Sequence, residues 1–132
     1  MKTLETRLPI ESWDENTYKE IDGGRRLTRA DVGLGAADGI DSATFVSLLL
    51  YRADGTSEYV SQMHIDGTLD GRSGSFVLHG SGSYDGTTAF GEYQVVADSA
   101  TGELAGLTGT LVSSSTHADY PNMPLTLTYA LG

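Results

Sequence analysis

Short stretches of alternating apolar and polar residues, separated by glycine-rich turns, run along the whole chain. Asp-Gly pairs between such stretches, as at residues 54–55 and 70–71, are strong short-range signals for a tight β-hairpin. With these turns as boundaries, the alternation predicts about eight strands. The predicted strands are residues 5–13, 26–34, 44–52, 57–66, 74–84, 88–97, 104–113 and 124–131.

Strands of this length and spacing are typical of β-sandwiches and up-and-down barrels. Residues 14–26, 33–42 and 113–124 lack a clear strand pattern, and we expect loops there, at the rims of a pocket. A closed barrel of about eight strands is filled by side chains or holds one small ligand, and closure removes exposed strand edges. We therefore expect one all-β domain over residues 1–132, a small closed antiparallel barrel. A two-sheet sandwich stays open as the alternative, because sequence does not show closure.

The alternation also predicts which side chains point inward. In residues 57–66 the more apolar face carries Tyr59, Met63 and Ile65, so we expect that face inside and His64 outside. In residues 74–84 the inward face carries Phe76, Leu78, Gly80, Gly82 and Tyr84, with His79 outside.

Four tyrosines are predicted to face the interior. The same test turns Phe45, Leu49 and Tyr51 inward in residues 44–52, and Tyr93 inward in residues 88–97. Together with Tyr59 and Tyr84, these rings surround the expected cavity. A buried phenol needs a hydrogen-bond partner, so their hydroxyl groups are candidates for contacts with a ligand.

The strand at residues 44–52 is apolar on both faces. Its outward side chains include Leu48 and Leu50. A contiguous exposed apolar stripe usually marks an interface, so a partner subunit in a homodimer is the expected cover.

The amino-acid composition limits the classes of partner and cofactor that we expect. The net charge is −10, without any basic run, which disfavours nucleic acid and anionic membranes. The chain has no cysteine, and its three histidines fall at none of the short spacings of zinc sites, so we expect no metal and no other cofactor. Residues 1–13 lack the apolar stretch of a signal peptide, and the longest apolar run, at 48–51, is too short to span a bilayer. A cytoplasmic location is the simplest expectation.

Several short motifs follow one another in a fixed order. They are WDENTY at 13–18, GG at 23–24, LTRA at 27–30, YRADG at 51–55, GRSGSF at 71–76 and TGELAGLTG at 101–109. Together they resemble the signature of a widespread bacterial family of unknown function whose members form an allene-oxide-cyclase-like barrel. The resemblance implies the barrel and no particular activity, because a fold does not determine function. Similar small barrels include allene oxide cyclase and polyketide cyclases, so the analogy favours ring-forming or dehydrating chemistry.

Two positions depart from the family pattern. An acidic residue often stands where this chain has Met63, and a histidine where it has Gly80. Both positions lie on faces predicted to point inward. A long apolar side chain opposite a glycine predicts a larger and more apolar cavity than the family pattern implies.

Glu15 and Arg29 are the candidate ion pair at the barrel mouth. A carboxylate beside an apolar ligand can have its pKa raised and then serve as acid or base. The alternative is a structural tie between the first loop and the second strand.

Histidines are the other candidates for proton transfer. His64 and His79 have the side chain best suited to shuttle protons near neutral pH. Alternation places both outside, and a single β-bulge would reverse that, because one extra residue moves later side chains to the other face. His117 lies in a Ser/Thr-rich segment and either closes over the mouth or is a solvated loop residue.

Taken with what the resemblance implies, these residues lead to the hypothesis of a cofactor-free enzyme of the cyclase or dehydratase type, which binds an apolar, oxygenated natural product such as a polyketide. The predicted catalytic residues are Glu15, Tyr51, Tyr59, Tyr93 and His64. The predicted substrate-binding residues are Trp13, Tyr18, Arg29, Phe45, Leu49, Met63, Phe76, His79 and Tyr84. The alternatives are a non-catalytic carrier or sensor of an apolar metabolite, and a structural barrel whose rings only fill the interior.

Overall fold

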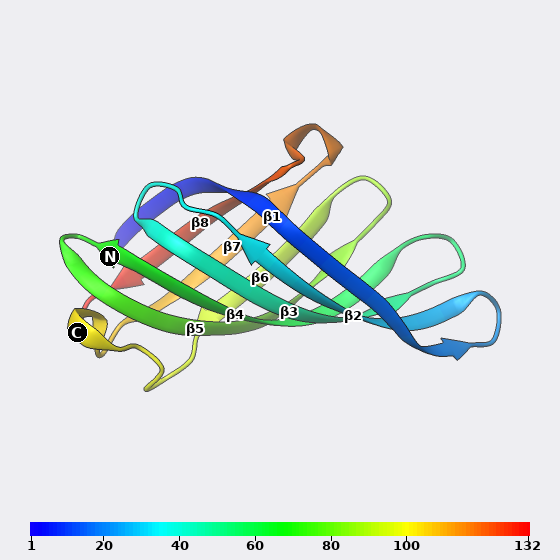
Figure 1. Ribbon diagram of the computed structural model, residues 1–132, viewed down its shortest axis with the longest axis horizontal. Coiled ribbons are helices and arrows are strands. Elements are labelled where there is room, and N and C mark those ends of the chain that lie inside the picture. Colours follow the sequence, from blue (N-terminus) through cyan, green and yellow to red (C-terminus); the bar gives the residue numbers. More distant parts are fainter.

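Turns and loops join successive strands, so that the chain runs up and down around one ring (Figure 1). The computed structural model describes residues 1–132. Its strands are β1 (Lys2–Ile21), β2 (Arg25–Leu34), β3 (Ile40–Tyr51), β4 (Ser57–Leu69), β5 (Arg72–Tyr84), β6 (Ala89–Val95), β7 (Thr108–Ser115) and β8 (Asn122–Ala130). Each strand pairs antiparallel with the next, and β8 returns to the first part of β1. This last pairing closes the barrel, so the predicted barrel is confirmed and the sandwich alternative is excluded.

The Asp-Gly turns behave as the sequence predicts. Between β4 and β5, Asp70 and Gly71 both have positive φ, at 52° and 77°. Two consecutive residues of positive φ are characteristic of the tight hairpin turn whose twist matches that of the flanking strands. The turn leaves every residue from Ser57 to Leu69 paired with a residue of β5.

The segment at 14–26 is a correction to the sequence analysis. It is not a loop across the barrel end: β1 continues to Ile21, turns at Gly23 and Gly24, and pairs back along β2. The segment looked like a loop because the hairpin projects beyond the barrel, where both of its faces meet solvent and polar residues fill both (Figure 1). Register shifts after Ile10 and Thr17 mark bulges in β1.

The prediction of a strand over residues 104–113 was too long at its start. Residues Gly102–Leu104 form a single turn of 3-10 helix, and β7 begins only at Thr108. Leu104 and Leu107 are buried in this segment and close the barrel at the end that holds the two termini. A second turn, His117–Asp119, precedes β8 at the opposite end. No helix in the structure has the length and hydrophobicity that crossing a membrane requires.

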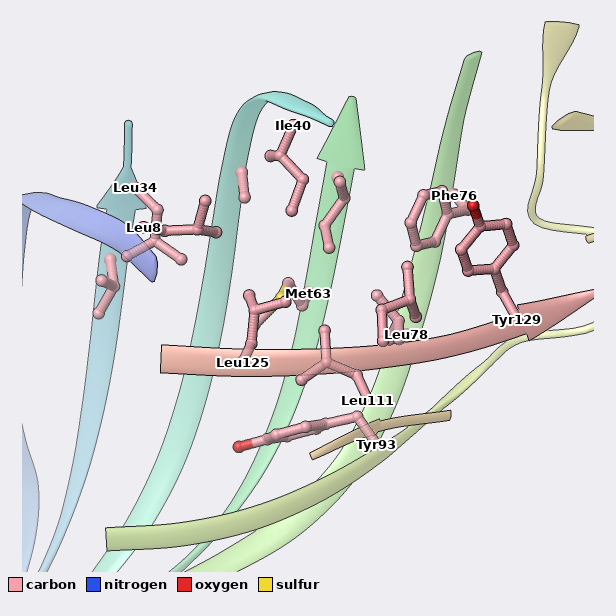
Figure 2. Packing of buried hydrophobic residues seen from close by; sticks show 14 of the residues in the cluster. Leu8, Leu34, Ile40, Met63, Phe76, Leu78, Tyr93, Leu111, Leu125 and Tyr129 are labelled. Carbon is pink, nitrogen blue, oxygen red and sulfur yellow. The ribbon is translucent and has the colours of Figure 1, made fainter. Parts of the chain in front are cut away.

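The apolar core fills the half of the barrel next to the termini. Inward side chains from all eight strands meet there, as Figure 2 shows for the labelled residues. The largest fully buried side chains include Leu8, Met63, Ile65, Phe76, Leu78, Leu111 and Leu127. Burying each one contributes roughly 1.5–3 kcal/mol, so this half is a packed support and not a pore. The inward faces predicted for β3, β4 and β5 are confirmed by this packing.

Candidate functional site

A cavity of about 360 Å³ lies in the other half of the barrel, at the mouth formed by the β3–β4, β5–β6 and β7–β8 connections. Aromatic and aliphatic side chains line most of it, and hydroxyl groups are spread among them. Its lining residues are Ile10, Trp13, Phe45, Ser47, Leu49, Tyr51, Ser57, Tyr59, Tyr84, Ala89, Tyr93, Ser113, Ser115, His117, Asn122 and Met123. The volume is at the lower end of the range of roughly 300–1,000 Å³ found for small-molecule sites.

Seven of the predicted site residues meet around this cavity. They are Trp13, Phe45, Leu49, Tyr51, Tyr59, Tyr84 and Tyr93. Trp13 stands at the edge of the mouth, half-exposed, with its ring edge-on to Phe45 at a centroid distance of 6.1 Å. The structure therefore brings together side chains from β1, β3, β4, β5 and β6 that are far apart in sequence.

Glu15 organises the rim beside Trp13. Its Oε2 accepts hydrogen bonds from the Tyr51 hydroxyl at 2.7 Å and from the Thr28 hydroxyl at 2.8 Å. Its Oε1 accepts one from the Trp13 indole N–H at 2.9 Å. Burial by itself raises the pKa of Glu15, but the bonds from Tyr51, Trp13 and Thr28, with the nearby Arg26, outweigh burial and bring the pKa below its ordinary value.

The predicted chemistry of Glu15 is thereby corrected. Of the two interpretations, the ion pair with Arg29 and a raised pKa is wrong. The alternative, a structural tie to the second strand, agrees with the hydrogen bond that Thr28 of β2 donates to Glu15. Arg29 alternates to the outer face of β2, where it pairs with Asp31 at 3.2 Å in solvent. The cation near Glu15 is Arg26, whose guanidinium lies 4.5 Å from the centroid of the Tyr51 ring.

Tyr51 is the counterpart of Glu15 in this contact. Burial and the hydrogen bond to the Glu15 carboxylate raise the pKa of Tyr51 to about 12. Its phenol therefore keeps its proton at neutral pH and holds it toward Glu15. Tyr51 acts as a fixed hydroxyl at the rim and not as a phenolate.

Deeper in the cavity, two tyrosine rings lie against glycines of β5 and β6. Tyr59 is paired with Gly82, and Tyr93 with Gly80. A Cβ on Gly82 would approach the Tyr59 ring to 2.6 Å, and one on Gly80 would approach Tyr93 Cδ1 to 2.8 Å. The glycines thus provide the space in which the rings lie flat over the sheet.

This packing corrects the expectation of a cavity enlarged at Met63 and Gly80. The space over Gly80 is occupied by the ring of Tyr93. Met63 is 1% exposed and packs in the core beneath the cavity. Neither departure from the family pattern creates open volume.

A small group of hydroxyls lies beside Tyr93. Ser47 Oγ and Ser61 Oγ share a buried hydrogen bond of 2.6 Å. Burial raises the pKa of Tyr93, and a hydrogen bond from Ser61 partly offsets it. Burial and the neighbouring Tyr93 also raise the pKa of Tyr59. Both phenols therefore stay protonated and neutral inside the barrel.

His117 is the imidazole that the structure places at the cavity. Its Nε2 lies 3.2 Å from the Tyr84 hydroxyl, and the two rings meet edge to face at 6.4 Å. The Tyr84 hydroxyl also donates to the Gly86 carbonyl at 2.9 Å. The sequence left His117 open between a mouth residue and a solvated loop residue, and the contact with Tyr84 favours the first.

Six predicted site residues lie elsewhere. Tyr18, Arg29, His64 and His79 are exposed on the outside of the barrel or its hairpin. No bulge interrupts β4 or β5, so alternation holds and keeps both histidines outside. Met63 and Phe76 are fully buried in the core below the cavity. None of the six contributes to the cavity lining.

Sequence reasoning missed most of the polar lining. Ser57, Ser113, Ser115 and Asn122 line the mouth. Ser113 and Ser115 follow the buried Leu111 at alternate positions of β7, which is a period-two signal. The prediction of a loop over residues 113–124 overlooks this signal, which continues β7 to Ser115.

Comparison with known proteins places the chain in a family. A family model described as "Protein of unknown function (DUF3224)" matches residues 5–129. The chain belongs to the DUF3224 family. The expected family of unknown function is thus confirmed at that level, and membership carries no activity with it.

A crystal structure from the DUF3224 family supports the fold. The crystal structure of a DUF3224 protein of unknown function from Shewanella oneidensis MR-1 aligns with a TM-score of 0.75 over 99% of each chain, at 23% sequence identity. At that identity the likeness shows the shared barrel alone. No curated protein matches the chain. The feature of this DUF3224 protein that bears on its function is therefore its own cavity.

Proposed function

We propose that this DUF3224 protein binds a small, largely apolar, oxygen-bearing molecule in the mouth cavity. The observation that carries the proposal is the cavity itself, about 360 Å³ with aromatic walls and hydroxyl groups at several heights. Sites of this composition obtain affinity from buried apolar area and orientation from a few polar groups. The packed core beneath keeps the walls in place without any ligand.

The charge of the lining agrees with a neutral ligand. Glu15 is an anion at the rim whose hydrogen bonds are directed to Trp13, Thr28 and Tyr51. No lysine or arginine lines the cavity. A strongly anionic molecule would therefore lack a counter-charge inside the barrel and would lose its hydration without compensation. Alcohols, phenols, ketones and ethers suit the hydroxyl lining.

A second candidate function is catalysis of the cyclase or dehydratase type, as in allene-oxide-cyclase-like barrels. The observation that favours it is His117, an imidazole hydrogen-bonded to Tyr84 at the same cavity. In this reaction Glu15 would not donate a proton, because its lowered pKa keeps it ionised. His117 would transfer the proton, and the tyrosines would hold the substrate oxygen. Exchange of His117 for asparagine would then abolish turnover and leave ligand binding intact.

Binding is tested with the neutral apolar probe N-phenyl-1-naphthylamine, whose fluorescence rises in an apolar site. A matched pair of variants separates the cavity from the outer surface. Leu49 points into the cavity and Leu48 points outward on the same strand, with 8% and 46% exposure. We expect the wild type and Leu48→Trp to bind the probe, and Leu49→Trp to lose it because the larger side chain occupies the cavity.

Thermal unfolding checks that each variant is folded. We expect both to fold, because overpacking costs about 1–3 kcal/mol. Equal binding by the two variants would assign the probe to the outer surface and refute the proposal. Absence of binding to the wild type would favour the structural barrel without ligand.

A further inference from the structure

Most hydroxyl hydrogens around the mouth cavity are already committed to acceptors within the protein. A tyrosine hydroxyl carries one hydrogen and two acceptor lone pairs. When the hydrogen is donated inside the protein, the group can only accept from a ligand. When the oxygen already accepts, the hydrogen remains for the ligand. The pattern of committed hydrogens therefore defines which end of a ligand each wall recognises.

At the rim, three side-chain hydrogens are donated to Glu15. Tyr51 and Thr28 donate to Oε2, and Trp13 donates to Oε1. An ionised carboxylate has no hydrogen of its own to offer. Arg26 stacks on the Tyr51 ring but does not line the cavity. The rim thus presents the Tyr51 oxygen to the cavity as an acceptor.

Deeper inside, the direction is reversed. Ser47 and Ser61 share one buried hydrogen bond of 2.6 Å with each other, in which either hydroxyl group can be the donor. The Tyr93 hydroxyl makes no hydrogen bond to an acceptor in the protein, and Tyr93 lines the cavity at 5% exposure. Its hydrogen is left for a ligand.

Two further hydroxyl groups in the lining, those of Tyr84 and Ser113, are consistent with a donor deep in the cavity and acceptors elsewhere. Tyr84 donates to the Gly86 carbonyl, and Ser113 donates to the Pro124 carbonyl at 2.6 Å. Both are therefore acceptors toward the cavity. Tyr93 is the deep donor, because its hydrogen has no acceptor in the protein. Tyr51, the last residue of β3, is the acceptor at the mouth, because its hydrogen is donated to Glu15.

We infer that the cavity binds an aromatic or polyene carbonyl compound with a distal hydroxyl group, its carbonyl oxygen at Tyr93 and its hydroxyl group at Tyr51. The inference rests on the proposed function, because it concerns the same cavity. It adds the chemical class of the ligand and the direction in which the ligand enters.

Three compounds of nearly equal size test the polarity. 1-(6-Hydroxynaphthalen-2-yl)ethanone carries both groups, its methyl ether lacks the donor, and 6-ethyl-2-naphthol lacks the carbonyl acceptor. Dissociation constants are measured by calorimetry or by displacement of N-phenyl-1-naphthylamine. We expect the first compound to bind about five- to tenfold more tightly than either comparator, the difference that one hydrogen bond makes.

Two variants identify which tyrosine binds the carbonyl end of the ligand and which binds its hydroxyl end. Tyr93→Phe is expected to abolish the preference for the ketone over 6-ethyl-2-naphthol and to keep the preference for the hydroxyl over the methyl ether. Tyr51→Phe is expected to do the reverse. Both keep the aromatic ring, so the packing over Gly80 and beside Arg26 is preserved. Tyr18→Phe, an exposed tyrosine outside the cavity, is the matched control and should change neither preference.

The outcomes separate this inference from the proposed function. Equal binding of the three compounds to the wild type, or preferences unchanged by both variants, would overturn the polarity while cavity binding still holds. The polarity would also be overturned if Tyr93→Phe abolished the preference for the hydroxyl group and Tyr51→Phe abolished the preference for the ketone. Failure of the wild type to bind any of the compounds or the fluorescent probe would overturn both proposals.

Discussion

At the scale of single residues, Glu15 shows how a few contacts decide the chemistry of a carboxyl group. The position of Glu15 at an apolar mouth suggests a raised pKa for its carboxyl group. Three hydrogen-bond donors at 2.7–2.9 Å lower the pKa instead. Trp13, Thr28 and Tyr51 come from three different strands, so Glu15 also ties the base of the projecting hairpin to β3. Its role is to accept hydrogen bonds and fix the orientation of Tyr51.

Exchange of Glu15 for glutamine tests this role. The folded pKa of Glu15 lies below its ordinary value of 4.5, so ionised Glu15 stabilises the fold above that pH. This contribution is lost as the pH falls through the folded pKa. We expect Glu15→Gln to lower the free energy of unfolding by about 0.5–1 kcal/mol near neutral pH, since solvent screens a partly exposed carboxylate, and by less near pH 3. Urea unfolding at both pH values measures the difference.

Glu20→Gln is the control, because Glu20 is exposed on the projecting hairpin and its carboxylate makes no hydrogen bond. A loss of stability in Glu15→Gln that is the same at both pH values would contradict the assigned charge state.

At the scale of elements, β4, β5 and β6 combine inward glycines with tyrosine rings. Gly80, Gly82 and Gly91 lie beneath the rings of Tyr59 and Tyr93. A tyrosine facing a glycine across the sheet restores the packing that glycine lacks, and it covers the exposed backbone. The arrangement places two rigid phenols over one wall of the cavity.

Gly80→Ala tests this arrangement. The new Cβ would lie 2.0 Å from the Glu92 carbonyl oxygen and 2.7 Å from Tyr93 Cα, and both are backbone atoms that cannot move alone. We expect a loss of at least about 2 kcal/mol in the free energy of unfolding, measured with urea. Ser81→Ala on the outer face of the same strand should change it by no more than about 0.5 kcal/mol. Similar losses in both variants would show that the contact with Tyr93 and Glu92 does not determine stability here.

At the scale of the whole molecule, closure divides the barrel into a packed half and a hollow half. The pairing of Lys2–Pro9 with β8 completes the ring, and Leu8 on that segment is fully buried. The opposite end lacks such apolar fill, and aromatic rings and hydroxyls surround open volume there. The stable half and the binding half are thus different parts of the same strands.

Leu8→Ala is expected to destabilise the entire barrel. Removing a fully buried leucine side chain costs about 2–5 kcal/mol. Leu8 also anchors the strand that closes the ring, so the loss should appear in one cooperative transition and not in a partial one. Leu48→Ala, on the exposed outer face, should cost below about 1 kcal/mol. Thermal or urea unfolding compares the two, and a similar small loss in both would show that the β1–β8 seam contributes little.

The outer apolar face is also a property of the whole molecule. Leu48, Val60 and Phe90 are 41–56% exposed on neighbouring outward faces of β3, β4 and β6. The predicted outward direction of Leu48 is confirmed. A homodimer over this face stays a prediction.

The strand number, the Asp-Gly hairpin turns and the inward faces of β3 to β6 could be predicted from the sequence, because these depend on local alternation and on Asp-Gly chemistry. Tyr51, Tyr59, Tyr84 and Tyr93 could be placed around one interior for the same reason. The polar hairpin at 14–26 could not, since a strand exposed on both faces has no apolar period.

The chemistry of the site could not be predicted in the same way, because it depends on contacts between strands. Pairing between strands brought Glu15 to Tyr51 and Thr28, and set His117 rather than His64 beside the cavity. It also filled the space at Gly80 with the ring of Tyr93. Hydrogen-bond partners and pKa shifts depend on distances between strands that are remote in sequence, and alternation along one strand contains no information about them.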